Sequence, residues 1–399
     1  MKNVQEIIDN RLCTGCGLCA ALIPNVRMEV DSEGFLTPSG IKENINNDLN
    51  AKILSICPGI NQINKNKDTS KENKIWGRIE VLKSGHSSDE EIRHKGSSGG
   101  VLTAIAIYLI ESNMVTGVLQ NTVSKNNPIE NLPCLSKSKI EIISNAGSRY
   151  APTSILQILP ELLKSNEKLA IIGKPCDISA AHNFLVENPK YKSQVPYMFS
   201  FYCAGQPSYF ATQKLLNQMG CNDEIDEFRY RGHGWPGDAT AITKDGIKYT
   251  MSYNDSWGKI LGKEIHFRCK ICPDGVGYFA DIVCADAWDT KDGYPDFKEK
   301  DGESLIIAKT SKGALLLEEL INKGVIISKQ LEIDKIKKIQ PYQFNRRVVI
   351  GARILGFIFS KKYILNFKGF NLLKNSFSTN FRNLFSNFLG TYKRSSKKK

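Results

Sequence analysis

Short apolar segments along this chain alternate with longer ones, and their order predicts an α/β fold. Three segments have the length and the β-branched or aromatic content of buried strands: Ile79–Leu82, Leu169–Gly173 and Tyr197–Tyr202. Val101–Ile110 and Ile155–Leu163 are long enough for helices, and another helix is expected from Pro207. The last two strands each lead through a turn into a helix, as in a parallel sheet. We therefore expect an α/β (mixed α+β) fold with an open parallel or mixed sheet.

The sequence outside this sheet region predicts three further parts. Residues 1–62 are expected to form a small cysteine-containing module, and residues 63–75 a linker, because the run Asn64–Lys74 is polar and lacks apolar periodicity. The sheet region then divides into residues 76–165 and 166–340, and residues 341–399 form a tail. A chain of 399 residues with 41% apolar content can bury a core in two or three such units.

The tail, residues 341–399, is basic and aromatic. It holds 13 of the 54 Lys and Arg residues and no Asp or Glu. Apolar side chains recur at helical spacing, on one predicted face: Phe377, Phe381, Leu384, Phe385 and Phe388. Such a segment suits contact with an anionic membrane surface or a partner subunit. The alternative is a helix packed on the body of the protein, followed by a basic end.

The position of the net charge of +13 argues against a nucleic-acid-binding protein. Outside the tail, the remaining 41 basic residues balance all 41 acidic ones, so no broad basic groove is expected. Met1–Leu12 lacks the apolar region of a signal peptide, and no run of 18 apolar residues occurs. The 11 cysteines then fit a reducing compartment. We expect a cytoplasmic protein, with the tail peripheral on the inner face of the membrane.

The cysteines of the N-terminal module predict an iron–sulfur site. Cys13, Cys16 and Cys19 follow the C-x2-C-x2-C spacing that supplies three thiolates to a 4Fe–4S cluster, and Cys57 precedes a proline. Glycines between the first three cysteines let backbone N–H groups approach the sulfur atoms. The usual fourth cysteine of a two-cluster motif is replaced by Ile23, so one cluster is expected here. Zinc is the weaker alternative, because zinc sites usually pair cysteines or include histidine.

Four further cysteines predict a second metal site. Cys176 and Cys203 each follow a predicted strand, at the edge where parallel sheets bind ligands. Cys269 and Cys272 repeat the x2 spacing and precede a proline. Zinc remains an alternative for this set, and Cys176 and Cys203 could instead be ordinary buried thiols.

Two glycine-containing turns are candidates for binding a cofactor phosphate. Ser97, Ser98, Gly99 and Gly100 precede the predicted helix from Val101, where backbone N–H groups can face an anion. The alternative is a simple serine cap with flexible glycines.

The second of these turns includes Ser148, Arg149 and Tyr150. Arg149 could pair with a phosphate and Tyr150 could stack on a ring. A surface turn whose arginine is satisfied within the protein is an equal alternative.

A polar and aromatic segment, Arg229–Gly237, contains the candidate catalytic residues His233 and Trp235. A histidine can transfer protons near neutral pH, and a tryptophan can stack on a planar ligand. The more ordinary interpretation is a glycine- and proline-rich loop anchored by a half-buried tryptophan.

Taken together, the SSGG and GSRY turns, Pro175–Cys176, Tyr202–Cys203 and CKICPDGVGYFADIVCADAW resemble the coenzyme F420 hydrogenase/dehydrogenase beta-subunit family. The resemblance covers about residues 76–340, as N-terminal-like and C-terminal-like domains of that family, preceded by a fused ferredoxin-like 4Fe–4S module. It implies a bound FAD held by the two turns and an inner 4Fe–4S cluster on Cys176, Cys203, Cys269 and Cys272. Asp281, Asp286 and Trp288 match the family pattern.

These observations predict an iron–sulfur flavoprotein oxidoreductase. Electrons would pass between two 4Fe–4S clusters and FAD, with hydride transfer to or from an organic small-molecule substrate. The first alternative is a coenzyme F420-oxidising or F420-reducing subunit that exchanges electrons with partner proteins in a larger complex or oligomer. The second is a non-enzymatic metal-bound interaction protein, which would contain zinc and no flavin.

Overall fold

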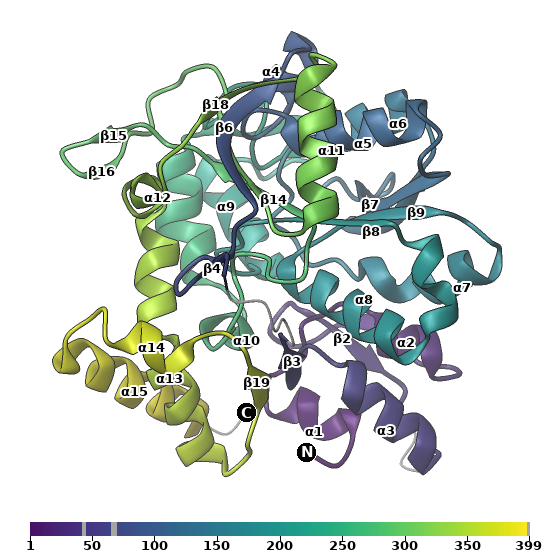
Figure 1. The fold of residues 1–399 in the computed structure, drawn as a ribbon, viewed down its shortest axis with the longest axis vertical. Helices are drawn as coiled ribbons and strands as arrows, with labels where there is room; N and C mark the ends of the chain where they lie inside the picture. Colours follow the sequence, from purple (N-terminus) through teal and green to yellow (C-terminus); the bar gives the residue numbers. More distant parts are fainter. Residues whose placement is uncertain (42–44, 65–69, 397–399) are drawn as a thin grey trace.

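The computed structural model of the protein describes residues 1–41, 45–64 and 70–396, and an eight-stranded mixed sheet lies at its centre (Figure 1). The strand order is β18–β6–β17–β14–β10–β9–β7–β8. In that order the strands span Ile326–Gln330, Val81–Ser87, Ser304–Ala308, Ile282–Asp286, Tyr197–Phe201, Leu169–Ile172, Gly117–Val123 and Asn131–Ser136. Strands β14, β10, β9 and β7 run parallel, and the strands on either side of them pair antiparallel. The predicted mixed α/β sheet is confirmed.

Helices cover both faces of this sheet (Figure 1). Helices α5 (Val101–Glu111) and α11 (Ser311–Asn322) pack on alternate strand residues such as Ala170 and Ile282. Helices α7 (Leu159–Lys164) and α8 (Pro175–Glu187) pack on the neighbouring positions of the same strands, on the opposite face. This two-sided burial follows from the alternation of side chains along a strand and explains the continuous apolar runs in the sequence.

Three of the predicted elements differ from the structure at their ends. The segment expected to be one helix from Ile155 is a 3-10 turn, Ile155–Ile158, followed by α7. The strand expected from Ile79 begins at Val81. The helix expected from Pro207 is α9 (Tyr209–Met219), because the Ser208 hydroxyl accepts the Ala211 N–H at 3.1 Å and caps the helix there.

A smaller antiparallel sheet lies next to α9. It consists of β11 (Ile225–Arg229), β12 (Ala239–Thr243) and β13 (Lys248–Met251), followed by a π-helix at Asn254–Ile260. The remaining short elements of this part of the chain are α4 (Glu90–Lys95), α6 (Lys139–Ser144), α10 (Phe267–Lys270), the 3-10 turns at Pro189–Gln194 and Leu261–Lys263, and the strand pairs β4–β5 (Glu72–Asn73, Gly77–Arg78) and β15–β16 (Thr290–Lys291, Tyr294–Pro295).

In its described residues, 1–41 and 45–63, the N-terminal module contains three helices and three short strands. They are α1 (Val4–Asp9), α2 (Leu18–Leu22), β1 (Arg27–Val30), β2 (Leu36–Ser39), α3 (Asn47–Ile56) and β3 (Asn61–Ile63). Part of the linker expected after this module, residues 65–69, lies outside the described residues. Within its remainder, Ile75 is buried in a hydrophobic cluster.

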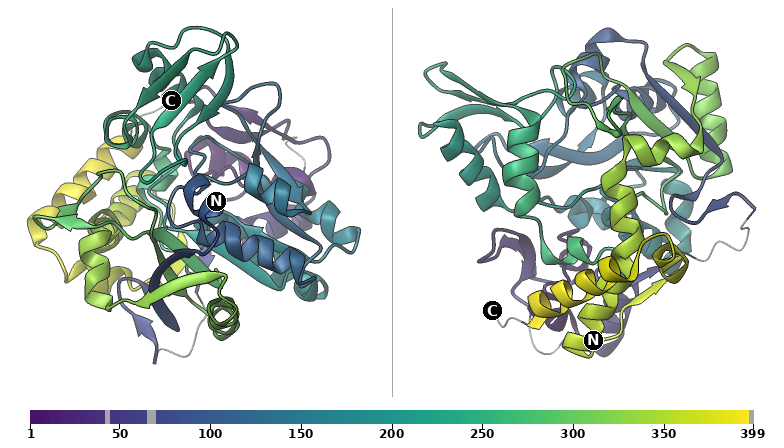
Figure 2. Two further views of the ribbon diagram at one scale, coloured as in Figure 1. Left: turned by 90° about the horizontal axis from the view of Figure 1, so that it is seen from above. Right: turned by 90° about the vertical axis from the view of Figure 1, so that its left-hand side faces the viewer.

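The C-terminal segment packs against the rest of the protein (Figure 2). It comprises α12 (Ile333–Ile339), α13 (Pro341–Lys361), β19 (Asn366–Lys368), α14 (Leu372–Ser376) and α15 (Phe381–Ser396). Strand β19 pairs in parallel with β3 of the N-terminal module. The buried Arg347 of α13 donates hydrogen bonds to the Ile75 carbonyl at 2.9 Å and the Tyr278 hydroxyl at 2.7 Å. Residues 341–396 therefore contribute to the folded body.

The helix predicted from the aromatic spacing of the tail is confirmed for Phe381, Leu384, Phe385 and Phe388, which lie on α15, and is wrong for Phe377. Phe377 caps α14 and lies before α15 begins at Phe381, so it does not share a helix with the other four residues. Leu384 packs into the hydrophobic cluster beneath α13, whereas Phe381 and Phe385 are exposed. None of the described helices is long and apolar enough to span a membrane.

Candidate metal centres and cofactor-binding region

The four cysteines of the N-terminal module, which we call the outer set, lie around one small cavity. Cys13, Cys16 and Cys19 come from the loop that enters α2, and Cys57 follows the last turn of α3. The Gly15 N–H points at the Cys13 sulfur, 3.4 Å away. The structure thus brings together the four residues that the spacing suggested as ligands of one cluster.

Glycine is required in the loop of the outer set for two reasons. Gly17 has a φ of +84°, a conformation that residues with a Cβ rarely adopt. A Cβ on Gly17 would also lie 2.8 Å from the Ser154 Cβ, because the loop packs closely on the 3-10 turn before α7. Two hydrogen bonds fix this contact: Ser154 Oγ donates to the Gly15 carbonyl at 2.9 Å, and the Leu156 N–H donates to the Cys16 carbonyl at 3.0 Å.

Without a bound metal, burial raises the free energy of the thiolate forms of the outer-set cysteines. Desolvation and the neighbouring Cys57 raise the pKa of Cys16 to about 12. Desolvation followed by the charges of Cys13, Cys16 and Cys57 raises the pKa of Cys19 well above its ordinary value. Four sulfur atoms this close together hold negative charge only when a cation or cluster compensates it. The donor set is therefore chemically suited to iron.

The second set, which we call the inner set, lies around an adjacent cavity. Cys176 is in the first turn of α8, directly after β9, and Cys203 follows β10. Cys269 is in α10 and Cys272 follows it, and both face the same cavity. Both cysteines thus follow neighbouring parallel strands, at the sheet edge where the sequence predicts ligands.

The loop that carries Cys272 is held by a buried carboxylate. Asp274 is 1% exposed and accepts the N–H groups of Gly275, Val276 and Gly277 at 2.7–2.9 Å. These bonds fix the backbone directly after the cysteine pair.

Unpaired polar atoms in the inner cavity are consistent with a bound cluster. Thr153 Oγ1 and Arg268 Nη1 are buried, line the cavity and have no hydrogen-bond partner among the described residues. Cluster sulfides and cysteine sulfurs accept hydrogen bonds, so both atoms are suited to that role. Within the described part of the chain, no three His, Cys, Asp or Glu side chains are arranged to hold a single metal ion. This finding concerns single ions; in a 4Fe–4S cube the four thiolates bind separate corners.

Three residues connect the inner and outer cavities. Cys13 and Thr14 line both of them. The fully buried Arg268 donates to the carbonyls of Pro58 at 2.7 Å and Gly59 at 2.8 Å, directly after the outer-set Cys57, and is itself adjacent to the inner-set Cys269. Two clusters bound here would be immediate neighbours, separated by these side chains.

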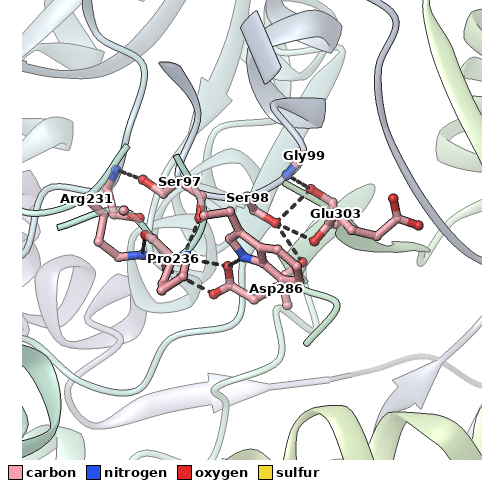
Figure 3. Close-up of polar contacts among 12 residues, drawn as sticks. Ser97, Ser98, Gly99, Arg231, Pro236, Asp286 and Glu303 are labelled. Atoms are coloured by element: carbon pink, nitrogen blue, oxygen red, sulfur yellow. Dashed lines mark hydrogen bonds and ion pairs between the residues drawn. The ribbon is translucent and has the colours of Figure 1, made fainter. Parts of the chain in front are cut away.

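The predicted flavin-binding turns meet in a polar network centred on Arg231 (Figure 3). Its guanidinium forms two hydrogen bonds with the Asp286 carboxylate, at 2.8 and 3.0 Å, and another with the Ser97 carbonyl. The Ser97 hydroxyl in turn accepts the Ser148 N–H, and Asp286 also accepts the Trp235 indole N–H at 2.8 Å. Ser97, Ser148, Trp235 and Asp286, predicted separately, thus lie together.

The SSGG turn is held mainly by hydrogen bonds within the protein. Ser98 Oγ donates to the Glu303 carbonyl at 2.9 Å, and the Gly99 N–H donates to Ser304 Oγ at 2.9 Å. Gly100 has a φ of +70° and begins α5 without a side-chain cap. The N-terminal end of α5 is therefore the feature of this turn that best suits an anion.

Three other predicted cofactor contacts, Arg149, Tyr150 and Asp281, are occupied within the protein. Arg149 donates to the Asn131 side chain at 2.8 Å and to the Phe228 carbonyl at 2.6 Å, and Tyr150 packs on Trp257 with ring centroids 4.6 Å apart. Asp281 lies at the opposite end of β14 from Asp286 and accepts the Thr310 hydroxyl at 2.7 Å.

The two candidate catalytic residues differ in exposure. Trp235 is 3% exposed and stacks on Trp288 with ring centroids 4.7 Å apart. His233 is exposed and lies edge-on to His94. Partial desolvation, then the charges of Arg229 and His94, lower the pKa of His233.

Arg231 and Arg268 are functional candidates that the sequence reasoning did not single out. Both are almost fully buried. Arg231 lies in the polar and aromatic segment Arg229–Gly237, and Arg268 directly precedes the cysteine pair. The sequence shows an arginine beside each motif, but it does not show that these arginines are buried, and their burial is what marks them as candidates.

Comparison with known proteins confirms the resemblance. Residues 82–160 match the family described as "Coenzyme F420 hydrogenase/dehydrogenase, beta subunit N-term", and residues 166–334 match the corresponding family for the C terminus of the same protein. The "Coenzyme F420 hydrogenase subunit beta" of Methanococcus voltae is 22% identical over 70% of this chain and 98% of its own length.

Two further matches extend this comparison. The "Coenzyme F420-dependent sulfite reductase" of Methanocaldococcus jannaschii is 21% identical over 86% of this chain, which spans half the length of that relative. A chain in a structure of the F420-reducing [NiFe] hydrogenase complex from Methanosarcina barkeri shares the fold, with a TM-score of 0.57, 19% identity and coverage of 74% of this chain and 98% of that chain. These relatives are oxidoreductases or their subunits. The two domain matches cover more than half of the sequence, and this chain belongs to the coenzyme F420 hydrogenase/dehydrogenase beta-subunit family.

Proposed function

We propose that this protein is an electron-transfer subunit of an oxidoreductase, and that it exchanges electrons with coenzyme F420 through FAD and two 4Fe–4S clusters. The observation that carries the proposal is the convergence of eight cysteines into two adjacent sets, with Cys13 lining both cavities. Family membership and relatives named for F420 support the choice of coenzyme.

The two clusters would be held by the outer set and the inner set. Each cluster moves single electrons, and FAD would couple them to hydride transfer. Lys174, Arg268 and Arg346 line the inner cavity and offset the negative charge of bound thiolates. Apolar side chains around the outer set, including Leu18 and Ile56, exclude water. The cations lower the cost of burying the thiolate charge, whereas the apolar side chains limit the access of solvent to the cluster.

For FAD, the support is the uncapped N-terminal end of α5 at Gly100, beside the Arg231 network. In this proposal α5 receives a phosphate, while Arg231 and Asp286 hold the surrounding turns in place. Trp235 acts through Asp286 as a positioning residue. The exposed His233, with its lowered pKa, is neutral at pH 7 and can accept a proton from a substrate.

The exposed residues Phe381 and Phe385 on the basic helix α15 support a contact with an anionic membrane surface or a partner subunit. This proposal concerns the assembly of the protein and is independent of its redox chemistry.

The experiment that tests the proposed function is oxidation of reduced F420 by anaerobically purified protein with a one-electron dye as acceptor. Wild-type protein should reduce the dye. Cys269→Ser, which removes an inner-set thiol, should abolish this transfer. Cys134→Ser is the matched control, because Cys134 is half-buried and belongs to neither set. Dye reduction by Cys269→Ser at the wild-type rate would refute the route, and wild-type protein unable to oxidise F420 would refute the coenzyme.

A further inference from the structure

A third cavity, separate from those of the inner and outer sets, lies next to the inner set between α10, α13 and α15. Its volume is about 480 Å³, within the range of roughly 300–1,000 Å³ that is usual for small-molecule sites. Cys269 and Arg346 line both this cavity and the inner cavity. The helices α13 and α15 that form its walls follow residue 334, where the family match ends. We call this cavity the basic groove.

The basic groove concentrates positive charge. Lys270, Arg346 and Arg353 line it, and Arg394 lies close enough to influence Lys270 and Arg353. The described residues that line it include no Asp or Glu. Across the described part of the chain, none of these four cations forms an ion pair with an acid. Like charges gathered without a counter-charge destabilise the fold, so the arrangement favours an anionic ligand.

The hydrogen bonds of the groove arginines show which cations remain for a ligand. Arg346 donates to the carbonyls of Cys203 at 2.8 Å and Cys269 at 2.7 Å, so its guanidinium is directed to the inner set. Arg353 donates to neutral groups, the Asn387 side chain at 2.8 Å and the Lys270 carbonyl at 3.4 Å. Desolvation, together with Arg346 and Arg394, lowers the pKa of Arg353 to about 10. A negative charge bound beside Arg353 would relieve this repulsion.

We propose that the basic groove binds a small molecule that carries phosphate or carboxylate groups. Arg353 and Lys270 supply the charge, and the side chains of Asn345 and Asn383 offer hydrogen bonds to its remaining oxygen atoms. The open groove and its volume suit a small anion better than a flat protein surface would. The inference concerns binding alone, and it stands or falls separately from the proposed redox function.

The test is isothermal titration calorimetry of the full-length, anaerobically purified protein, with inorganic pyrophosphate and citrate as separate probes. Saturable binding of pyrophosphate alone identifies a phosphate site, and saturable binding of citrate alone identifies a carboxylate site. Arg353→Gln should weaken binding by about tenfold or more, equivalent to one charge-assisted contact. Arg382→Gln is the control, because Arg382 is exposed on α15 and does not line the groove.

A second variant keeps the test decisive if Arg353→Gln does not fold. Asn345→Asp places a carboxylate in the groove at an exposed position and should also abolish anion binding. Absence of saturable binding to wild-type protein by both probes would overturn the proposal. Equal weakening by Arg382→Gln and Arg353→Gln would also overturn it, because binding would then reflect only the overall charge of the helix.

Discussion

Asp286→Asn should destabilise the protein strongly, because it removes the only acid that pairs with the buried Arg231 among the described residues. The Arg231 side chain is 3% exposed, and the carboxylate accepts two of its N–H groups at 2.8 and 3.0 Å. Breaking a buried pair at one partner typically costs about 3–5 kcal/mol, since the other charge stays buried. An asparagine still accepts one of these hydrogen bonds, so we expect about 3 kcal/mol, at the lower end of that range.

The assay is urea unfolding followed by tryptophan fluorescence, which reports directly on this site because Trp235 stacks on Trp288. Asp289→Asn is the matched control: Asp289 pairs with Lys300 at 2.6 Å, but its side chain is 63% exposed. Exposed pairs contribute about 0–1 kcal/mol, so the control should unfold close to wild type. If Asp286→Asn loses no more stability than Asp289→Asn, the argument that Arg231 depends on Asp286 is refuted.

Three further predictions concern other parts of the structure. Desolvation lowers the pKa of the buried Lys309 to about 8, so the unfolded state binds more protons than the folded state between pH 8 and 10.5. The free energy of unfolding of wild type relative to Lys309→Met should therefore rise by about 3 kcal/mol across that pH range. A difference that does not change with pH would contradict this pKa. Gly17→Ala should lower the iron content of purified protein, whereas Gly220→Ala, which has a similar φ of +80° but open space around it, should retain full iron. Replacing Phe381 and Phe385 by serine should weaken co-sedimentation with anionic vesicles if α15 contacts a membrane, and unchanged sedimentation would remove that proposal.

Two central strands of the sheet, β9 and β10, could be predicted from the sequence because they are buried on both faces. Residues Leu169–Ile172 and Tyr197–Phe201 lie between α5 and α11 on one side and α7 and α8 on the other, and so they are apolar except for the buried Ser200. The C-x2-C turn in each cysteine set was also visible because its spacing is local, whereas Cys57, Cys176 and Cys203 join these turns from distant segments.

The features that the sequence did not reveal depend on contacts between distant segments. The predicted helical face of the tail grouped Phe377 with Phe381 by spacing alone, but α14 ends before α15 begins. Arg347 and β19 fix the C-terminal segment onto the core and the N-terminal module, and no local pattern marks either contact. Arg231 likewise gains its importance from Asp286, 55 residues further along the chain.

The most direct test of the central proposal is the content of iron, acid-labile sulfide and zinc in anaerobically purified protein. Two 4Fe–4S clusters predict about eight iron and about eight sulfide per chain. About four of each would mean that only one cysteine set holds a cluster, which contradicts the two-cluster route. Zinc in place of iron would contradict electron transfer altogether, because zinc has no redox chemistry.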